Sequence, residues 1–288
     1  MSEIFINGIG AVTPQHTHDN EKFLENIERY DHNNLRCVNP NFKAFIPPME
    51  LRRMSRIIRM GVASARIGMK EAGIEMPDAI ITGTGMGCVE DTEKFLISMI
   101  ENKEQLLTPT SFIRSTHNTV GAQIALKLKC HNYNFTYVHR GFSFENAIQD
   151  AMMLIQEGEA SNVLAGGIDE TSDNHYSISS RLGFWKDKPI TNLNLLQEKS
   201  EGTIAGEGSV FTVLSDLKGE RNYGKVLSVD TFILPENHFF IKQRIESFLE
   251  HSNMDSIDID LVILGYSGDI RYDKVFDSIR NELFFNFN

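Results

Sequence analysis

The sequence predicts an α/β fold, because apolar runs of strand length alternate with segments whose apolar residues recur at helical spacing. The runs IFINGIGAV (4–12) and DAIITG (78–83) are typical of buried strands, and the glycines of the first suggest a backbone in close approach to a neighbour. Between them, residues 51–72 carry a helical apolar stripe, and Gly73 supplies a helix stop. This alternation favours a mostly parallel sheet covered by helices.

The pattern continues along the chain. Helices are expected at 92–100 and 118–128, a strand at 132–138, a helix from Ser143 that ends before Gly158, and a strand at 161–167. The later part predicts a strand pair, a helix, and then a strand, turn and helix; the segments are 201–216, 222–234, 240–253, 259–269 and 273–284. Two parts follow, 1–219 and 220–288, and the second is incomplete because it holds one clear βα unit.

Composition limits the classes of function. A chain of 288 residues with 41% hydrophobic residues can bury a substantial core. Its formal net charge of -11 argues against non-specific binding to nucleic acid or to an anionic membrane surface. No membrane-span pattern or signal peptide is visible, and the odd set Cys37, Cys88 and Cys130 suits reduced thiols, so we expect a cytoplasmic protein.

Candidate ligand sites are weak. ITGTGMG (80–86: Ile81 follows Ile80, and Gly87 closes the turn) lacks the full spacing of a dinucleotide-binding loop and is interpreted as a tight strand-to-helix turn. The pair His16 and His18, like the acidic segment 169–175, lacks metal-site spacing. We therefore expect no metal and no cofactor.

Basic residues gather on the predicted first helix of this acidic chain: Arg52, Arg56, Arg59, Arg66 and Lys70. Their spacing is close to whole helical turns, which places them on one side. This strip either is a solvated face or docks an acidic partner, since arginines bind carboxylate and phosphate well.

The turn at 138–142, which we call the elbow, joins the strand ending in TYV to the helix beginning at Ser143. A thiol at such a helix N-terminus would be activated, because the N–H groups and the helix dipole stabilise its thiolate. The elbow contains no cysteine. Ser143, with His139 as a conceivable base, is a weak nucleophile candidate, and the simpler interpretation is an N-cap.

Several segments resemble the β-ketoacyl-acyl carrier protein synthases of the thiolase-like superfamily, in the same order along nearly the whole chain. They are INGIGAVTP, PDAIITGTGMG, HNTVGAQIALKL, the elbow, GEASNVLAGGIDE and EGTIAGEGSVFTVLSD. The resemblance implies the layered αβαβα thiolase fold, in which two related halves each contribute a sheet, and a protein that dimerises.

The departures from this family concern its Cys-His-His catalytic set. Alignment to LAGG places the family's cysteine at Gly141, whereas alignment to NYNFTYV places it at His139. Gly265, in LGYSGD, stands where one catalytic histidine would be, and the second lies beyond Asn288. Decarboxylative condensation needs a thiolate to carry the acyl group and imidazoles to stabilise the oxyanion.

The resemblance therefore implies a non-catalytic, chain-length-factor-like subunit that pairs with an active synthase and shapes an acyl pocket. RSTHNT and TYVHRGFSFE resemble a branch associated with aryl polyene and flexirubin pigments. A homodimer is the other possible assembly, and the basic strip could receive an acyl carrier protein. Phe142 and Phe144 either close the vacant pocket or are ordinary core residues.

Two alternatives remain open. The first is a repurposed acyltransferase or hydrolase that uses Ser143 with His139 or His117; it requires a hydrogen bond between hydroxyl and imidazole beside an open pocket. The second is a shortened synthase homologue, for which the missing second histidine would carry no meaning.

Overall fold

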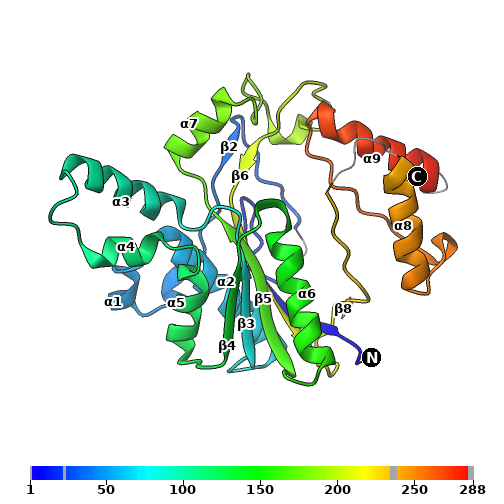
Figure 1. Ribbon diagram of the computed structural model, residues 1–288, viewed down its shortest axis with the longest axis horizontal. Coiled ribbons are helices and arrows are strands. Elements are labelled where there is room, and N and C mark those ends of the chain that lie inside the picture. Colours follow the sequence, from blue (N-terminus) through cyan, green and yellow to red (C-terminus); the bar gives the residue numbers. More distant parts are fainter. Residues whose placement is uncertain (1, 22–23, 234–238, 285–288) are drawn as a thin grey trace. The chain divides into compact units, whose positions relative to one another are not determined.

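The computed structural model describes residues 2–21, 24–233 and 239–284 (Figure 1). The chain forms two compact units. The first contains Met1–Glu28, Arg36–His175 and Gly206–Val229; the second contains Arg29–Leu35, Tyr176–Ala205 and Asp230–Asn288. The units are interleaved in sequence, because the chain leaves the first unit twice before Val229 and returns to it each time.

A six-stranded sheet with the order β4-β3-β5-β7-β1-β8 forms the centre of the first unit. Its strands are β1 (Phe5–Val12), β3 (Ala79–Gly83), β4 (Tyr133–Tyr137), β5 (Asn162–Asp169), β7 (Gly208–Ser215) and β8 (Gly224–Lys225). Strand β3 runs parallel to β4 and β5, whereas the pairings β5–β7, β7–β1 and β1–β8 are antiparallel. The prediction of a mostly parallel sheet is therefore wrong. The sheet is mixed because β7 begins where β5 ends, with Gly208 opposite Asp169, so the chain returns in the opposite direction.

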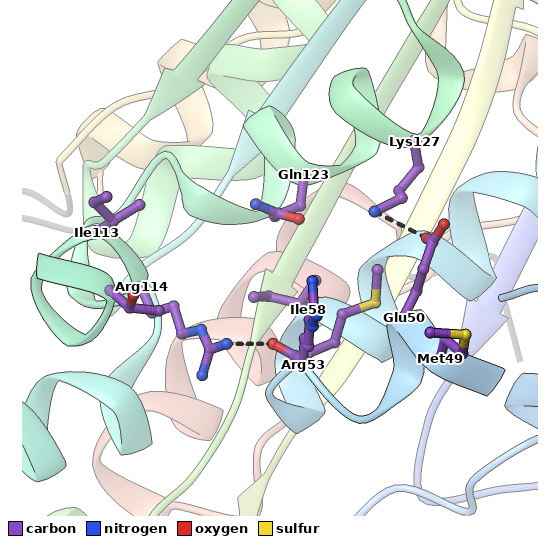
Figure 2. A pocket seen from close by; sticks show the side chains of 10 residues that line it. Met49, Glu50, Arg53, Ile58, Ile113, Arg114, Gln123 and Lys127 are labelled. Atoms are coloured by element: carbon purple, nitrogen blue, oxygen red, sulfur yellow. Dashed lines mark hydrogen bonds and ion pairs between the residues drawn. The ribbon is translucent and has the colours of Figure 1, made fainter. Parts of the chain in front are cut away.

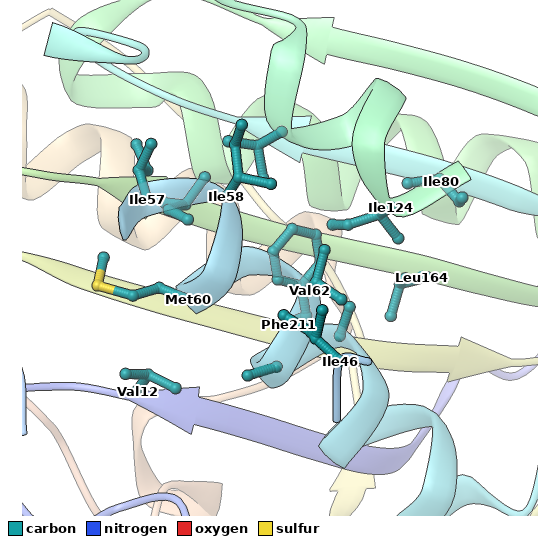
Figure 3. Close-up of a cluster of buried hydrophobic side chains, with 14 of the residues drawn as sticks. Val12, Ile46, Ile57, Ile58, Met60, Val62, Ile80, Ile124, Leu164 and Phe211 are labelled. Carbon is teal, nitrogen blue, oxygen red and sulfur yellow. The ribbon is translucent and has the colours of Figure 1, made fainter. Parts of the chain in front are cut away.

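Helices cover both faces of this sheet, which gives the unit its layers (Figure 1). Helices α2 (Arg56–Ala72) and α5 (Thr119–Leu128) pack on one face, and α6 (Ser143–Gln156) packs against β3 and β5 on the other. Figure 3 shows the core under α2, where Ile57, Ile58 and Met60 lie among side chains of the sheet. A second core cluster lies under α6 and includes Ile81, Ala147 and Leu214.

Two glycines of β1 allow α2 to approach the sheet closely. A Cβ atom at Gly10 would lie 1.9 Å from the carbonyl oxygen of Ser64, and one at Gly8 would lie 2.1 Å from that of Gly68. Backbone atoms cannot yield as a flexible side chain can, so only glycine fits at these positions. The close approach expected from the sequence of this strand is confirmed.

The helix expected at 51–72 is interrupted. Helix α1 (Pro48–Leu51) ends before Arg52, and α2 begins at Arg56. The other helices of the first unit are α3 (Val89–Glu101) and α4 (Pro109–Ser115), with the short 3₁₀ turns η1 (Phe42–Ala44) and η2 (Arg140–Phe142); α7 (Asp173–Arg181) begins in the first unit and ends in the second.

The second unit contains less regular structure than the sequence predicts. Helices α8 (Phe239–His251) and α9 (Ile270–Leu283) form, with 3₁₀ turns η3 (Asn192–Asn194) and η4 (Ser256–Asp258) and the short paired strands β2 (Asn34–Leu35) and β6 (Ala205–Gly206). The strand expected at 259–269 is absent: residues 261–267 belong to no helix or strand, and Ile263 is 87% exposed. A strand needs a neighbour to satisfy its backbone groups, and the described residues provide none there.

The strand expected within 222–234 is likewise reduced to Gly224–Lys225, and Leu234 lies outside the described residues. Within the described ranges, no helix has both the length and the apolar character needed to cross a membrane.

Candidate functional site

The elbow has the predicted strand–turn–helix geometry. Strand β4 ends at Tyr137, the turn η2 follows, and α6 begins at Ser143. Arg140 adopts a positive φ of 52°, a conformation that residues other than glycine seldom take. Such local strain persists where the surrounding structure fixes it, and here it reverses the chain within a few residues.

Ser143 closes the elbow with its side chain. Its buried hydroxyl donates to the carbonyl of Thr84 (2.8 Å) and accepts from the backbone N–H of His139 (2.8 Å). Ser143 is the first residue of α6 and not its N-cap, so the capping prediction is wrong. The hydroxyl fastens the turn to the loop after β3, because its partners lie upstream of the helix.

A carboxylate organises the same loop from the neighbouring strand. Asp169, the last residue of β5, accepts hydrogen bonds from the Thr84 hydroxyl (2.8 Å) and from the N–H groups of Gly85 and Met86 (both at 2.9 Å). Gly83 lies directly under the start of α6, since a Cβ atom there would lie 2.3 Å from the Ser143 carbonyl oxygen. The ends of β3 and β5 are therefore held against the elbow.

A cavity of about 290 Å³, which we call the elbow cavity, opens beside this turn. Its lining residues come from the ends of β3 and β5, the elbow, the first turn of α6 and the start of β7: Gly83, Arg140, Gly141, Ser143, Phe144, Glu145, Gly167, Ile168, Asp169 and Gly208. None of them has a thiol or an imidazole. A Cβ atom built at Gly141 meets nothing within 4 Å, so this position has room for a side chain that it does not carry.

Comparison with known proteins assigns the chain to a family. Residues 7–219 match the family described as Beta-ketoacyl synthase, N-terminal domain. The chain belongs to this family. The matched stretch contains the whole elbow and every residue that lines the elbow cavity.

Curated relatives are similar to the chain over part of their length. A 3-oxoacyl-acyl-carrier-protein synthase 2 of Synechocystis is 22% identical over 254 residues, and one of Staphylococcus aureus strain N315 is 24% identical over 246 residues. These alignments cover 78% and 77% of this chain but only 61% and 59% of the two relatives. The chain therefore spans less than two thirds of the synthases it matches.

Solved structures show the same fold. The ishigamide ketosynthase/chain length factor superposes with a TM-score of 0.73 at 19% identity, over 95% of this chain and 75% of that one. A β-ketoacyl synthase from Burkholderia phymatum gives 0.72 at 16% identity, over 96% and 78%. A ketosynthase in complex with its chain length factor from Xenorhabdus doucetiae gives 0.52 at 17% identity, over 75% and 79%. At these identities the likeness establishes the thiolase-like ketosynthase fold.

The aromatic and imidazole side chains near the elbow do not form a catalytic pair with Ser143. The His139 ring stacks on Phe142, with 5.3 Å between ring centroids, and only the backbone of His139 bonds Ser143. His117 packs against Gly87, where a Cβ atom would lie 2.9 Å from its ring, and it does not line the elbow cavity. The hydroxyl–imidazole bond required by the hydrolase alternative is therefore absent from the described hydrogen bonds of Ser143.

The two phenylalanines differ in their surroundings. Phe144 lines the elbow cavity over Gly167 and is 40% exposed, so it is not an ordinary core residue. Phe142 is not among the lining residues. Only Phe144 is placed to restrict this cavity.

The cysteines lie elsewhere and are unsuited to act as nucleophiles. Cys37, Cys88 and Cys130 are all buried and free. Burial is the main reason that the pKa of Cys37 and that of Cys88 are both raised to about 12, so these two thiols stay protonated at neutral pH.

The predicted basic strip is not one exposed face. Arg56 forms an ion pair with the buried carboxylate of Glu207, and its side chain is only 24% exposed. Arg59 is partly buried and donates from Nε to the Met54 carbonyl (3.0 Å). Arg52 is exposed but lies in the break between α1 and α2. The strip is wrong for Arg56, because helical spacing alone cannot reveal a buried partner 151 positions away.

Glu207 is a buried residue whose importance the sequence did not reveal. Its carboxylate pairs with Arg56 and with Arg36 (3.3 Å) and accepts the N–H of Cys37 (2.7 Å). Burial alone would raise the pKa of Glu207, but the hydrogen bond and charge of Arg56 outweigh it and hold the pKa below its ordinary value. This cluster stabilises the start of β7 against α2.

Two further positions considered in the sequence have no chemical setting. Gly265 lies in the irregular segment 261–267 of the second unit, where a Cβ atom would lie 3.3 Å from the ring of Phe276. In the part of the chain that the structure describes, no group of three or more His, Cys, Asp or Glu side chains is placed to hold a metal ion.

Proposed function

We propose that this chain is a non-catalytic β-ketoacyl synthase-like subunit, similar to a chain length factor, that pairs with an active synthase in the cytoplasm. In this role the partner supplies the reactive thiolate and imidazoles. The chain supplies an elbow, part of a pocket and a pairing surface for the biosynthesis of a fatty-acid- or polyketide-type product such as an aryl polyene.

The observation that carries the proposal is the retained elbow without a nucleophile. The strained turn, the start of α6 and a cavity of about 290 Å³ are all present, yet the lining offers Gly141 in place of a thiol and no imidazole. The one hydroxyl there, that of Ser143, is committed to the Thr84 carbonyl. Acyl transfer needs a nucleophile activated by a base, and this lining holds no such pair.

The family explains why the geometry would be kept without the chemistry. Ser143, Thr84 and Asp169 tie β4, β3 and β5 together at one edge of the sheet, so the elbow also has a structural task. A subunit that gave up condensation would still need this edge. The loss of a thiol at Gly141 removes no contact from it, because a side chain there would meet nothing within 4 Å.

The pairing surface that we propose is strand β4. It is the edge strand of the sheet, and its aromatic rings remain exposed: Tyr133 by 43% and Phe135 by 46%. Phe135 contacts the ring of Tyr137, with 5.0 Å between centroids, so the rings form a continuous apolar row. An open edge with exposed aromatic residues favours association with another chain.

Known structures with this fold support pairing as a role for it. One is a complex of a ketosynthase with its chain length factor, and another contains an acyl-carrier protein with its ketosynthase. For this chain we propose a heterodimer with a synthase, with a homodimer as the other assembly. Arg52, which is exposed, is the member of the basic strip best placed for contact with an acyl carrier protein.

Co-expression tests the pairing. The chain is produced with a tagged ketosynthase from the same organism that retains its cysteine, and the stoichiometry of the purified complex is measured by light scattering. We expect a one-to-one complex that Phe135→Lys weakens at least tenfold, because the substitution places a charge in the apolar row.

Phe184→Lys is the matched control, since Phe184 is also a half-exposed phenylalanine but lies in the second unit. Failure of the wild-type chain to associate with any synthase of its organism would contradict the proposal. Equal weakening by both substitutions would contradict the choice of β4.

A further inference from the structure

A second, larger pocket lies in the first unit, away from the elbow cavity. It has a volume of about 570 Å³ and opens between the α1–α2 segment and helices α4 and α5 (Figure 2). It shares no lining residue with the elbow cavity. Its volume is within the range of small-molecule sites in proteins, about 300–1,000 Å³. We call it the α1–α5 pocket.

One part of the α1–α5 pocket is apolar. Met54 and Ile58 are buried members of the main core cluster and form its base, and Ile113 faces them from α4. Met49 adds a largely exposed side chain at the rim. This surface suits a short hydrocarbon chain, whose contact with it would be removed from water.

The polar part of the pocket carries an excess of positive charge. Its ionisable side chains are Arg53, Arg114, Lys127 and Glu50. Lys127 and Glu50 neutralise each other in an ion pair of 2.8 Å, which leaves the two arginines. An excess of positive charge is unexpected in a chain whose net charge is -11.

The two arginines have no carboxylate partner among the described ion pairs. The guanidinium of Arg114 reaches across the pocket to the backbone carbonyl of Arg53, as Figure 2 shows. This contact brings two like charges to the same rim without a counter-ion between them. An oxyanion bound there would relieve their repulsion and accept hydrogen bonds from planar donors suited to carboxylate and phosphate.

We propose that the α1–α5 pocket binds a small amphipathic oxyanion. The headgroup, a carboxylate or a phosphate, lies between Arg53 and Arg114, and an apolar tail lies over Met54, Ile58 and Ile113. The proposal does not depend on the proposed function, because it uses none of the elbow residues and no partner chain.

Calorimetric titration of the full chain tests this site. The probes are octanoate, which has both parts of the ligand; 1-octanol, which has the tail without the charge; and inorganic phosphate, which has a charge without the tail. We expect saturable binding of octanoate at one site and at least tenfold weaker binding of octanol. Phosphate that competes with octanoate would identify a phosphate headgroup, and phosphate that does not compete would identify a carboxylate.

Substitutions locate the binding. Arg114→Gln should weaken octanoate at least tenfold, and Arg53→Gln, at an exposed position, gives a second test if the first variant does not fold. Arg181→Gln is the control, since Arg181 is an exposed arginine of the second unit. No saturable binding of octanoate, octanol binding as tight as octanoate, or equal affinity in the Arg53 and Arg114 variants would overturn the proposal.

Discussion

Restoring a thiol at the elbow probes the consequence of its loss. Gly141→Cys introduces a side chain where a Cβ atom meets nothing within 4 Å, so we expect the fold to be kept. Gly141 does not have a positive φ, which means that the backbone also tolerates the change. The new thiol would lie in the elbow cavity two residues before α6, a helix of 14 residues.

The expected reactivity follows from the charges around that position. A helix N-terminus stabilises an adjacent anion by about 0.3–1 kcal/mol, and Arg140 adds a positive charge, whereas Glu145 and Asp169 oppose ionisation from the same cavity. We expect a net lowering of the thiol pKa by about one unit from its usual ~8.5. The thiolate fraction at pH 7 would then rise about eightfold. Because intrinsic nucleophilicity falls with pKa, the net gain in rate is about threefold.

Alkylation by iodoacetamide at pH 7, followed by intact mass measurement, checks this expectation. Gly206→Cys is the matched control, since Gly206 is also exposed and free of contacts but does not precede a helix. The native protein should remain nearly unlabelled, because its three cysteines are buried. A thiol at position 141 that reacts more slowly than the control would refute the idea that the elbow retains an activating environment.

Three further predictions concern stability, each measured by urea unfolding. Glu207→Ala leaves Arg56 without its carboxylate and should reduce the free energy of unfolding by about 3 kcal/mol, whereas Glu75→Ala, at an exposed position, should leave it unchanged. Gly10→Ala forces a methyl group against the Ser64 carbonyl and should cost at least about 1–3 kcal/mol, in contrast to Gly206→Ala, which meets no atom. Burial, and then the charges of Glu90 and Asp91, raise the pKa of Glu170 from 4.5 to about 8 despite opposing effects of the Glu90 N–H and of Arg56, so the folded state holds a proton that the unfolded state releases; stability should fall as pH rises from about 4.5 to about 8, and Glu170→Gln should flatten this dependence.

Sequence periodicity was sufficient to predict the main elements around the elbow. Strands β3, β4 and β5 are short apolar or β-prone runs, and α6 has one apolar stripe with Gly158 beyond its end. These are local signals, so they remain readable without knowledge of the neighbours. The room at Gly141 could not be predicted, because it depends on atoms from other strands.

The features that the sequence did not reveal depend on distant partners. The direction of β7 is set by its pairing with β5, and the burial of Arg56 is set by Glu207. Neither relation leaves a periodic signal. The apolar run at 259–264 was interpreted as a strand for the opposite reason: it has the local pattern, but no described strand pairs with it.

Acyl transfer from a carrier protein tests the central claim most directly. The chain is incubated with acyl-loaded acyl carrier protein, alone and with a synthase of the same organism that retains its cysteine, and covalent label is located by mass spectrometry of peptides. We predict label on the synthase only. Label on this chain in the absence of the synthase, lost in Ser143→Ala, would contradict the account and identify a working nucleophile at the elbow.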